Sequence, residues 1–402
     1  MKCPLVPFGR LYAEPVRNGL TRPTAVRGDG YRMVNMGELF AYDRMSDQPM
    51  ERVQLNDREL AVATLEVGDL LFARSSLKPE GTGKCSIVIS LPEVTTFESH
   101  LIRARLDRNK ADPRYYFYFF QSFLGRATVL SIAKQVGAAG LPGSKLAGLE
   151  VPHPATEVQS RIADVLVAYD DSIENNCRRI TLLEDVARQL HREWFVRLRF
   201  PGCEHASIDR HVPKGWRPHT FGDHCEEIRD SVSPEAMEPA TPYIGLEHIP
   251  RRSISLSEWG AVEDVTSNKH RYRENDILFG KIRPYFHKVG IAFTDGVASS
   301  DAIVIRPKDA KLLPLVLMTA SSDPFVAATS QTMREGSKMP RADWKQMQAY
   351  PVPLPPDGLL QSFNDFINPI LAQLKTLSFM NRRLKAARDL LLPRLMSGEV
   401  TV

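Results

Sequence analysis

Cysteine is scarce in this sequence of 402 residues, and long apolar runs are missing. The five cysteines form an odd number and include no Cys-x-x-Cys motif, which argues against a disulfide framework and favours a reducing compartment. No apolar stretch approaches the length of a membrane span, and the N-terminal segment lacks the apolar centre of a signal peptide. These absences predict a soluble, cytoplasmic protein.

The motifs of common catalytic and nucleotide-binding sites are also absent. There is no Gly-x-Gly-x-x-Gly and no P-loop, because Gly81-Thr-Gly-Lys84 lacks the first glycine of a P-loop. The glycine motif for S-adenosylmethionine, the Asn-Pro-Pro-aromatic tetrapeptide of adenine methyltransferases, Gly-x-Ser-x-Gly and His-Glu-x-x-His are missing too. We therefore expect a non-catalytic chain without a bound cofactor.

Two groups of residues have some features of a metal site, and neither fits well. Asp323 and Asp343-Trp-Lys345 have the loose spacing of a metal-dependent nuclease, but the first half of the chain has no counterpart. The second group is a cluster whose spacings match no standard zinc pattern: Cys203, His205, His211, His219, His224 and Cys225. We predict no metal site.

The strongest positive signal is a pair of long periodic stretches, in which apolar residues recur at alternating steps of four and three. That 3.5-residue period is the seam of a coiled coil, and each seam carries one asparagine near its middle, a residue that lowers stability but fixes register. The first seam is Ile162, Leu166, Tyr169, Ile173, Asn176, Ile180, Leu183, Ala187, Leu190 and Trp194. The second is Ile367, Ile370, Leu374, Leu377, Asn381, Leu384, Arg388, Leu391 and Leu395.

We predict that these two helices pair with each other. The alternative is two ordinary amphipathic helices that lie on separate cores. Thr156 and Gln159 have capping-box spacing and mark the start of the first helix, which Pro201-Gly202 ends. With Asn176 in the seam, Asn176→Leu is expected to raise stability while loosening the register.

The second half of the chain repeats the first. Gly68-Asp-Leu-Leu-Phe-Ala-Arg74 is echoed by Asn275-Asp-Ile-Leu-Phe-Gly-Lys281, and Val151-Pro-His-Pro154 by Val352-Pro-Leu-Pro355. Short strands are predicted around these motifs, and the aromatic run Arg114–Leu124 is predicted to be a buried helix.

The predicted fold class is α+β, with two mixed α/β globular domains separated by two long helices that form an antiparallel coiled coil. We expect a first domain at 1–154, its helix at 155–200 and a linker at 201–218. A second domain follows at 219–356 and a second helix at 357–402. The first helix spans roughly 50 Å at 1.5 Å per residue. Two diverged heads on such a spacer would suit an asymmetric, two-part DNA sequence.

Basic residues gather in the loops between the predicted strands, where they are candidates for contact with DNA. Arginine and lysine in loops can position phosphates, and arginine can also bind guanine through two hydrogen bonds. The alternative for each is an ordinary solvated surface position. The candidates are Arg74, Lys84, Lys134 and Lys145 in the first half and Lys281, Arg283, Lys288, Arg334, Lys338 and Arg341 in the second.

The helical segments resemble a known family. Ile173-Glu-Asn-Asn176, Arg178-Arg179-Ile180 and Arg192-Glu-Trp-Phe195 are similar to the central conserved region of the specificity subunits of type I restriction–modification systems. Arg388–Glu399 is similar to their distal conserved region. The chain departs from the pattern at His153 and Ala155, where the family favours an aliphatic residue and proline.

The resemblance implies a DNA-binding subunit with two target recognition domains and two antiparallel helices. It implies two methyltransferase subunits and ATP-dependent nuclease/translocase subunits as partners, which would carry the catalysis. Arg192, Trp194 and Phe195 become candidates for partner contact, although Trp194 could instead end the seam. Two alternatives stay open: the DNA-recognition part of a fused nuclease–methyltransferase, and a protein scaffold that binds no DNA.

A change in spacer length tests this interpretation. Inserting seven residues into one long helix is expected to disrupt helix pairing or to change the gap between the two half-sites, while each half-site keeps its sequence. The recognised sequences of the variant, selected from a random duplex library with the methyltransferase present, give the gap. A folded variant with an unchanged gap would contradict the proposed spacer role.

Overall fold

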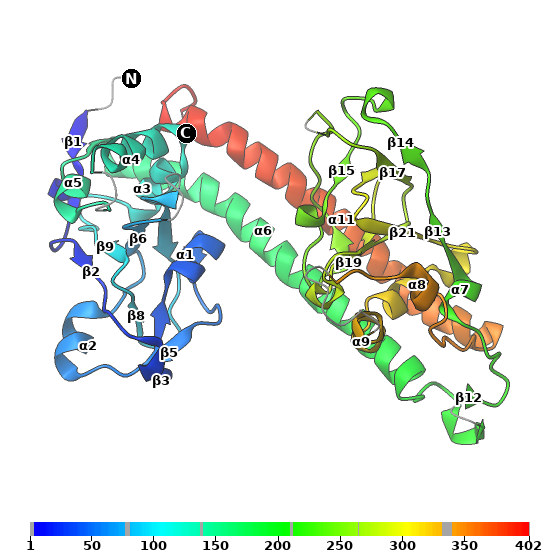
Figure 1. Cartoon of the computed structure of the whole chain (residues 1–402). Helices are drawn as coiled ribbons and strands as arrows, with labels where there is room; N and C mark the ends of the chain where they lie inside the picture. Colours follow the sequence, from blue (N-terminus) through cyan, green and yellow to red (C-terminus); the bar gives the residue numbers. More distant parts are fainter. Residues whose placement is uncertain are drawn as a thin grey trace. The chain divides into compact units, whose positions relative to one another are not determined.

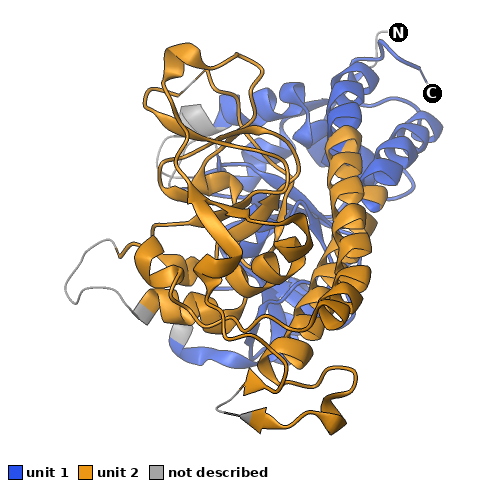
Figure 2. Cartoon of the chain, turned by 90° about the vertical axis from the view of Figure 1, so that its right-hand side faces the viewer, with its two compact units in different colours: residues 1–171, 385–402 blue, residues 172–384 orange. Residues whose placement is uncertain are grey.

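The computed structural model describes residues 4–76, 81–136, 140–209, 212–263, 265–331 and 340–401. The chain divides into two compact units, coloured separately in Figure 2. Unit 1 comprises residues 1–171 and 385–402, and unit 2 comprises residues 172–384. Unit 2 is one continuous stretch of the sequence, whereas unit 1 is not, because the C-terminal segment belongs to it.

A five-stranded sheet forms the centre of unit 1, in the order β2-β9-β6-β7-β4. Its strands pair antiparallel except for β4 and β7, which are parallel. A three-stranded sheet (β5-β3-β8) and the pair β1-β10 complete it. The strands are β1 (Leu5–Pro7), β2 (Arg17–Asn18), β3 (Arg27–Val34), β4 (Arg44–Met45), β5 (Glu51–Val53), β6 (Leu70–Ala73), β7 (Cys85–Val88), β8 (Thr95–Phe97), β9 (Leu101–Ala104) and β10 (Glu150–Pro152). The short helices are α1 (Met36–Ala41), α2 (Asp57–Ala63), α3 (Pro113–Gln121), α4 (Phe123–Val136) and α5 (Gly143–Ala147).

Unit 2 repeats this architecture with a five-stranded sheet in the order β13-β21-β18-β19-β16, in which only the edge pair β16 and β19 is parallel. Unit 2 also contains a four-stranded sheet (β14-β17-β20-β15) and the hairpin β11-β12. The strands are β11 (Ile208–Asp209), β12 (Val212–Pro213), β13 (Cys225–Ile228), β14 (Ser231–Val232), β15 (Tyr243–Ile244), β16 (Ser255–Leu256), β17 (Lys269–Tyr272), β18 (Ile277–Gly280), β19 (Val289–Ala292), β20 (Gly296–Ala298) and β21 (Ala302–Pro307). The short helices are α7 (Phe221–His224), α8 (Leu313–Ala320), α9 (Asp323–Gln331) and α10 (Trp344–Met347).

The duplication extends to single contacts. Phe8 donates its backbone N–H to the carbonyl of Leu149 at 2.7 Å, and Phe221 donates to Tyr350 at 2.8 Å. The glycine that follows each phenylalanine packs against a side chain at the end of a short helix. A β-carbon at Gly9 would lie 2.9 Å from Cβ of Ala147, and one at Gly222 would lie 2.8 Å from Cβ of Gln348. At these distances a β-carbon would force the neighbouring residue to shift, so glycine is favoured at both positions. Because the same contacts recur in both units, the predicted internal repeat is confirmed.

The repeated Gly/Asn-Asp motif forms the same turn before β6 and before β18. Gly68 and Asn275 have φ values of 95° and 71°, a left-handed conformation that glycine adopts freely and asparagine tolerates. The aspartate that follows closes the turn, because Asp69 accepts a hydrogen bond from the N–H of Glu66 at 2.7 Å. Asp276 accepts one from the N–H of Arg273, also at 2.7 Å.

Each of these aspartates also binds an arginine through two hydrogen bonds. Arg105 donates to the two carboxylate oxygens of Asp69 at 2.7 and 2.8 Å. Arg306 does the same to Asp276 at 2.8 and 2.7 Å. Both carboxylates are buried. Asp69 and Asp276 each directly precede a central strand, and their arginines lie at the end of β9 and within β21, so each pair ties the start of the central strand to its antiparallel neighbour. The aspartate of the motif therefore has a structural role in both units.

The aromatic run of unit 1 forms α3, and its six consecutive rings from Tyr115 to Phe120 are all buried. This confirms the predicted core helix as far as Gln121. The prediction is wrong at its end, because the helix is interrupted at Ser122, and both Phe123 and Leu124 are exposed at the start of α4. The hydroxyl of Tyr118 donates to Asp170 at 2.6 Å, and Arg388 donates to the other oxygen of the same carboxylate at 2.6 Å. Within unit 1, this buried aspartate therefore links α3 to both long helices.

The two long helices are α6 (Thr156–His191) and α11 (Asp357–Met396), and they run antiparallel (Figure 1). In unit 1, Ile162 and Leu166 near the start of α6 share a core with Leu395 near the end of α11. In unit 2, Ala187 near the end of α6 shares a core with Ile367 near the start of α11. Every residue of the two predicted seams is buried or half-buried. The seams also pack against the globular parts, so helix pairing and domain packing form one core in each unit.

The two ends of α6 differ from the sequence-based prediction. The helix begins at Thr156 as expected, but the carboxamide of Gln159 does not form a capping box. It accepts from the N–H of Asp112 at 2.9 Å and donates to the carbonyl of Pro154 at 2.8 Å, because it is fully buried against α3. After His191 the helix continues as a π-helical turn to Val196, before Pro201 is reached.

Within the described ranges, no single helix is both long and apolar enough to cross a membrane. One pair, Ala310–Ala320 with Asp323–Ser330, passes by length and composition only, and it is bent by 65°.

The seam asparagines bind each other, which changes the expected effect of replacing them. Asn176 donates to the side-chain oxygen of Asn381 at 2.9 Å, and both are buried in unit 2. Asn176→Leu alone would leave Asn381 without this partner, so we now expect a loss of about 1–3 kcal/mol in unfolding free energy. The double variant Asn176→Leu, Asn381→Leu should recover most of that loss. Urea unfolding of the three proteins measures this, and equal stability of the single and double variants would contradict it.

Candidate nucleic-acid interface

Three of the predicted basic residues of unit 2 lie together at the end of β18. Lys281 follows the strand directly, and Ile282 forms an isolated antiparallel bridge with Arg341. Arg283 donates its N–H to the carbonyl of Pro340 at 2.8 Å, so the segment before α10 runs beside the β18–β19 loop. The Arg341 guanidinium lies 3.6 Å from Asp301, and both Arg283 and Arg341 are exposed. We call Lys281, Arg283 and Arg341 the basic corner.

The β18–β19 loop next to the basic corner has a constrained backbone. Arg283 and His287 flank the 3-10 turn Pro284–Phe286 with φ values of 51° and 54°, in the left-handed region that most side chains avoid. The guanidinium of Arg251 stacks on the ring of Phe286 at 4.1 Å, and Arg283 lies 5.8 Å from the same ring. Tyr285 at the tip is half exposed. The loop therefore presents guanidinium groups and an aromatic ring in a fixed arrangement.

The corresponding corner of unit 1 is less basic. Arg74 follows β6, and its carbonyl accepts from the N–H of Leu141 at 2.7 Å, as Lys281 accepts from Ala342 at 2.8 Å. Lys84 is half-buried and bound within the unit: it donates to the carbonyl of Phe40 at 2.8 Å and lies 3.1 Å from Asp43. Lys145 is exposed on α5. Lys134 belongs to α4, but its side chain lies outside the described part of the chain.

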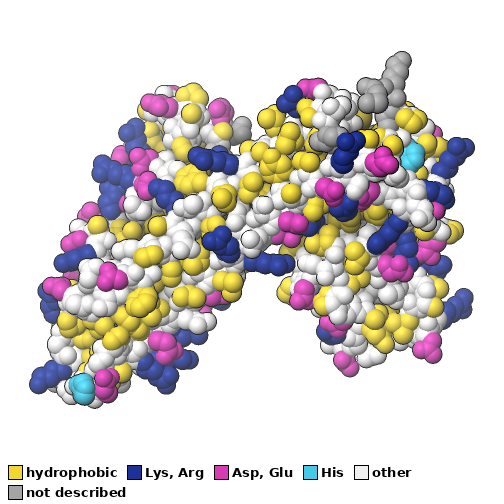
Figure 3. Space-filling model, turned by 180° about the vertical axis from the view of Figure 1, so that it is seen from behind, with side chains coloured by type: hydrophobic (Ala, Val, Ile, Leu, Met, Phe, Trp, Pro, Cys, Tyr) yellow, Lys and Arg dark blue, Asp and Glu magenta, His cyan; other side chains and the backbone are white. Residues whose placement is uncertain are grey.

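The remaining candidates are placed elsewhere or not placed. Lys288 donates its ammonium group to the carbonyl of Leu246, and burial together with the nearby Arg251 lowers the pKa of its amine. Its charge is therefore directed into unit 2. Arg334 and Lys338 lie outside the described residues. On the face shown in Figure 3, lysine and arginine side chains lie interspersed with aspartate and glutamate over both units.

The three partner-contact candidates differ in accessibility. Trp194 is only 6% exposed and packs on Phe363 at 5.8 Å between ring centroids. Phe195 is half-buried and also contacts Phe363, at 4.8 Å. Arg192 is exposed. The structure thus places Trp194 at the end of the seam, and Arg192 has the exposure that a partner contact requires.

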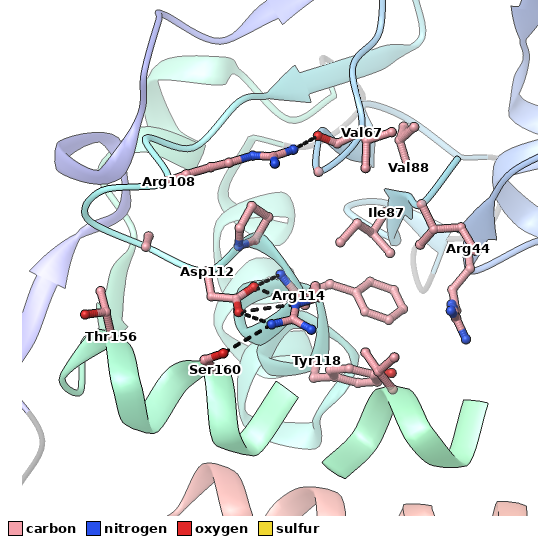
Figure 4. Close-up of a pocket in the computed structure, with 16 residues that line it drawn as sticks. Arg44, Val67, Ile87, Val88, Arg108, Asp112, Arg114, Tyr118, Thr156 and Ser160 are labelled. Carbon is pink, nitrogen blue, oxygen red and sulfur yellow. Dashed lines mark hydrogen bonds and ion pairs between the residues drawn. The ribbon is translucent and has the colours of Figure 1, made fainter. Parts of the chain in front are cut away.

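Unit 1 contains a cavity of about 580 Å³ between β7, the start of α3 and the start of α6 (Figure 4). Its lining is mostly apolar, with Val67, Ile87 and Tyr118 among the walls. Figure 4 shows that two of the arginines in its lining, Arg108 and Arg114, are already engaged. Arg114 donates to Asp112 at 2.7 Å and to Asp164 at 2.7 Å, and Arg108 donates to the carbonyl of Val67. These ion pairs join α3 to α6 within the unit.

The carboxylates considered for metal binding have other partners. Asp343 caps α10 by accepting from the N–H of Lys345 at 3.0 Å, and Asp323 pairs with Arg252 at 3.0 Å. His224 lies within 2.8 Å of the carbonyl of Val352 and is buried. In the part of the chain that is described, no three metal-ligating side chains converge.

The chain is similar to several known proteins. The profile of the type I restriction modification DNA specificity domain matches residues 63–185. The specificity subunit of the type I restriction enzyme MjaIX from Methanocaldococcus jannaschii is 24% identical over 306 residues, which cover 72% of this chain and 69% of that protein. Residues 63–185 therefore match a DNA specificity domain, and the chain is similar to specificity subunits of type I restriction–modification systems over most of its length.

Two further similarities agree with this match. The specificity subunit of the Escherichia coli enzyme EcoDI is 30% identical over 149 residues, or 36% of this chain and 32% of that protein. The crystal structure of the S subunit of a type I restriction–modification system from M. genitalium shares the fold, with a TM-score of 0.60 at 14% identity, over 98% of this chain and 96% of that one.

The buried His191 makes unit 2 sensitive to acid. Its ring stacks on Phe195 and lies 3.3 Å from the hydroxyl of Thr319, and burial lowers its pKa to about 4. The unfolded chain takes up this proton near pH 6.5, so the stability contributed by neutral histidine is full above pH 6.5. It is lost as the pH falls towards 4, by up to about 3 kcal/mol.

We therefore expect wild-type unfolding free energy to fall more steeply between pH 7 and pH 5 than that of His191→Gln, as measured by urea unfolding. His205→Gln is the matched control, since His205 is exposed. Its pH profile should follow the wild type. Equal slopes for wild type and His191→Gln would show that His191 does not carry the effect.

Proposed function

We propose that this subunit recognises an asymmetric, two-part DNA sequence, with one half-site contacted by the sheet loops of each unit. The observation that carries the proposal is the repeated sheet with unequal loops. Both units have the same strand order, but the loop after β18 carries the exposed Arg283 beside Arg341, whereas Lys84 in unit 1 is bound by Asp43. Two heads with the same frame and different contact surfaces suit two different short sequences.

The chemistry of the basic corner favours direct contact with duplex DNA. An arginine guanidinium can donate two hydrogen bonds to guanine in the major groove, and lysine can neutralise a phosphate. The backbone of Arg283 is held by its hydrogen bond and its left-handed conformation, so little backbone conformational entropy remains to be lost on binding. In unit 1 we propose Arg74 and Lys145 as the corresponding contacts.

We propose that the subunit itself is non-catalytic and acts with two methyltransferase subunits and with nuclease/translocase subunits. The absence of catalytic motifs from the sequence supports this. On this proposal, the recognition domains are residues 1–154 and 219–356, the spacer helices are 155–200 and 357–402, and residues 201–218 are a linker. The lengths of α6 and α11 would set the gap between the half-sites, and Arg192 and Phe195 would contribute to partner contact.

Selection from a randomised duplex library, with the methyltransferase subunit added, tests the proposal. We expect enrichment of two short motifs with a fixed gap. Arg283→Glu should relax or abolish selection at one half-site only, because Arg283 belongs to one unit. Arg217→Glu, an exposed arginine beside Leu354 in the same unit, is the control and should keep both motifs.

Two other outcomes would overturn the proposal. A chain that enriches no sequence would be a protein scaffold. A purified chain that methylates or cleaves DNA with Mg²⁺ and S-adenosylmethionine, without added subunits, would be part of a fused enzyme.

A further inference from the structure

Unit 2 contains a second cavity of about 580 Å³, and its lining is rich in arginine. One wall is the C-terminal part of α6 with the π-helical turn that follows, which contributes Arg188, Arg192 and Arg197. A second wall is the loop before β16, which contributes Arg251 and Arg252. The corner between α8 and α9 closes the third side. We call this cavity the arginine cleft.

The three carboxylates of the arginine cleft are paired with two of its five arginines. Arg188 pairs with Glu184 at 3.1 Å and with Asp185 at 3.0 Å. Arg252 pairs with Asp323 at 3.0 Å. These three are the acidic side chains in the lining, so the internal ion pairs engage two of the five arginines.

Of the other three arginines, Arg197 pairs with Glu193 just outside the lining, at 2.5 Å. The guanidinium groups of Arg192 and Arg251 have no hydrogen-bond or ion-pair partner among the described residues, and both side chains are exposed. Arg251 is nevertheless held in place by stacking on Phe286 at 4.1 Å. The cleft therefore offers two guanidinium groups, from two separate elements, to a ligand.

The loop that carries Arg251 and Arg252 is fixed to α6 by one buried carboxylate. Glu184 is 3% exposed, and one of its oxygens accepts four hydrogen bonds from the loop. The donors are the hydroxyls of Ser253 and Ser255, at 2.8 and 2.7 Å, and the N–H groups of Ile254 and Ser255, both at 3.1 Å. A buried charge with this many donors holds the loop in one position relative to the helix.

The backbone of the cleft is strained at two residues that are distant in sequence and hydrogen-bonded to each other. Arg252 and His287 have φ values of 57° and 54°, and the N–H of Arg252 donates to the carbonyl of His287 at 2.9 Å. Arg188 donates to the carbonyl of Arg252 at 2.6 Å. A left-handed conformation is unfavourable for such a residue, and strain of this kind is concentrated at binding sites.

The internal repeat shows that the fold does not require these arginines. When Arg178-Arg179-Ile180 is aligned with Arg382-Arg383-Leu384, Leu392 is the equivalent of Arg188, and Met396 is the equivalent of Arg192. Leu392 and Met396 are buried in the core of unit 1. The same helix position that packs an apolar core in one unit thus presents charge to a cavity in the other.

We propose that the arginine cleft binds a phosphate group. A phosphate has the oxygen geometry that the arginine fork matches, and two uncommitted guanidinium groups can balance two negative charges. The cavity volume also admits a diphosphate. The phosphate can come from the DNA backbone, which rests on the proposed function, or from a free phosphorylated molecule.

Pyrophosphate is the probe for the site itself. We expect calorimetric titration of the full chain to show one site, and Arg192→Ala with Arg251→Ala to weaken binding at least tenfold. The control removes the same charge from exposed positions of α6 outside the cleft, through Arg178→Ala with Arg179→Ala, and should change binding less than twofold. Thermal melting verifies that both double variants fold.

Duplex DNA, with the methyltransferase subunit added, is the second arm. If the backbone is the source, the cleft variant should bind all sequences more weakly by the same factor, and its salt dependence should fall by about two phosphate contacts relative to the control. Pyrophosphate binding at the cleft with an unchanged DNA salt dependence supports a free phosphorylated ligand. If the chain binds pyrophosphate at the cleft but binds no DNA, the cleft proposal is retained and only the proposed function is contradicted.

The phosphate proposal is overturned if the cleft variant matches the control in both arms. That result would leave sequence-specific DNA binding by the two units unaffected.

Discussion

Antiparallel packing of α6 on α11 is the constraint on which both cores depend. Unit 1 is closed by Leu392, Leu395 and Met396 from the last turns of the chain, and unit 2 by Ala187 and Trp194 from the first long helix. Each core therefore takes a wall from the opposite half of the sequence. The buried polar contacts in these walls, Asn176 with Asn381 and Asp170 with Arg388, admit one register only, because a shift would bury each group without its partner.

Within each unit, the central strand of the sheet is anchored by an ion pair at one end and leads into a loop at the other. β6 begins at the ion pair of Asp69 with Arg105, and β18 begins at that of Asp276 with Arg306. The opposite ends of the same strands lead into the loops of Arg74 and Lys281. The residues that repeat between the two halves are thus those that build the frame, and the residues that differ lie where a ligand can reach them.

Periodicity and repetition made the architecture predictable from the sequence. The 3.5-residue spacing gave both long helices, and the motif before each central strand gave the duplication. These signals are local, since they depend on residues within one or two turns or one strand. Burial of the aromatic helix α3 followed from the same kind of reasoning, because six consecutive rings cannot all face solvent.

The contacts that the sequence could not supply are those between distant segments. Gln159 has the spacing of a capping residue, but its carboxamide binds Asp112, 47 positions away. From the sequence, Lys84 is a candidate for contact with DNA, but in the structure its ammonium group pairs with Asp43. The arginine cleft joins α6 to residues near 251, 287 and 323, and the dipeptide Arg251-Arg252 was its one visible signal. Pairing of side chains across such separations depends on the completed fold.

The anchoring of β6 and β18 at the residues just before them also bears on how this protein can change over generations. A substitution in the loop beyond Arg74 or Lys281 leaves the aspartate–arginine ion pairs and the seam untouched. On the proposed function, such a substitution alters the contact surface at little risk to folding. Loops of this kind can accumulate variation while the frame is retained, and on that proposal the lineage can acquire new target preferences with the same scaffold.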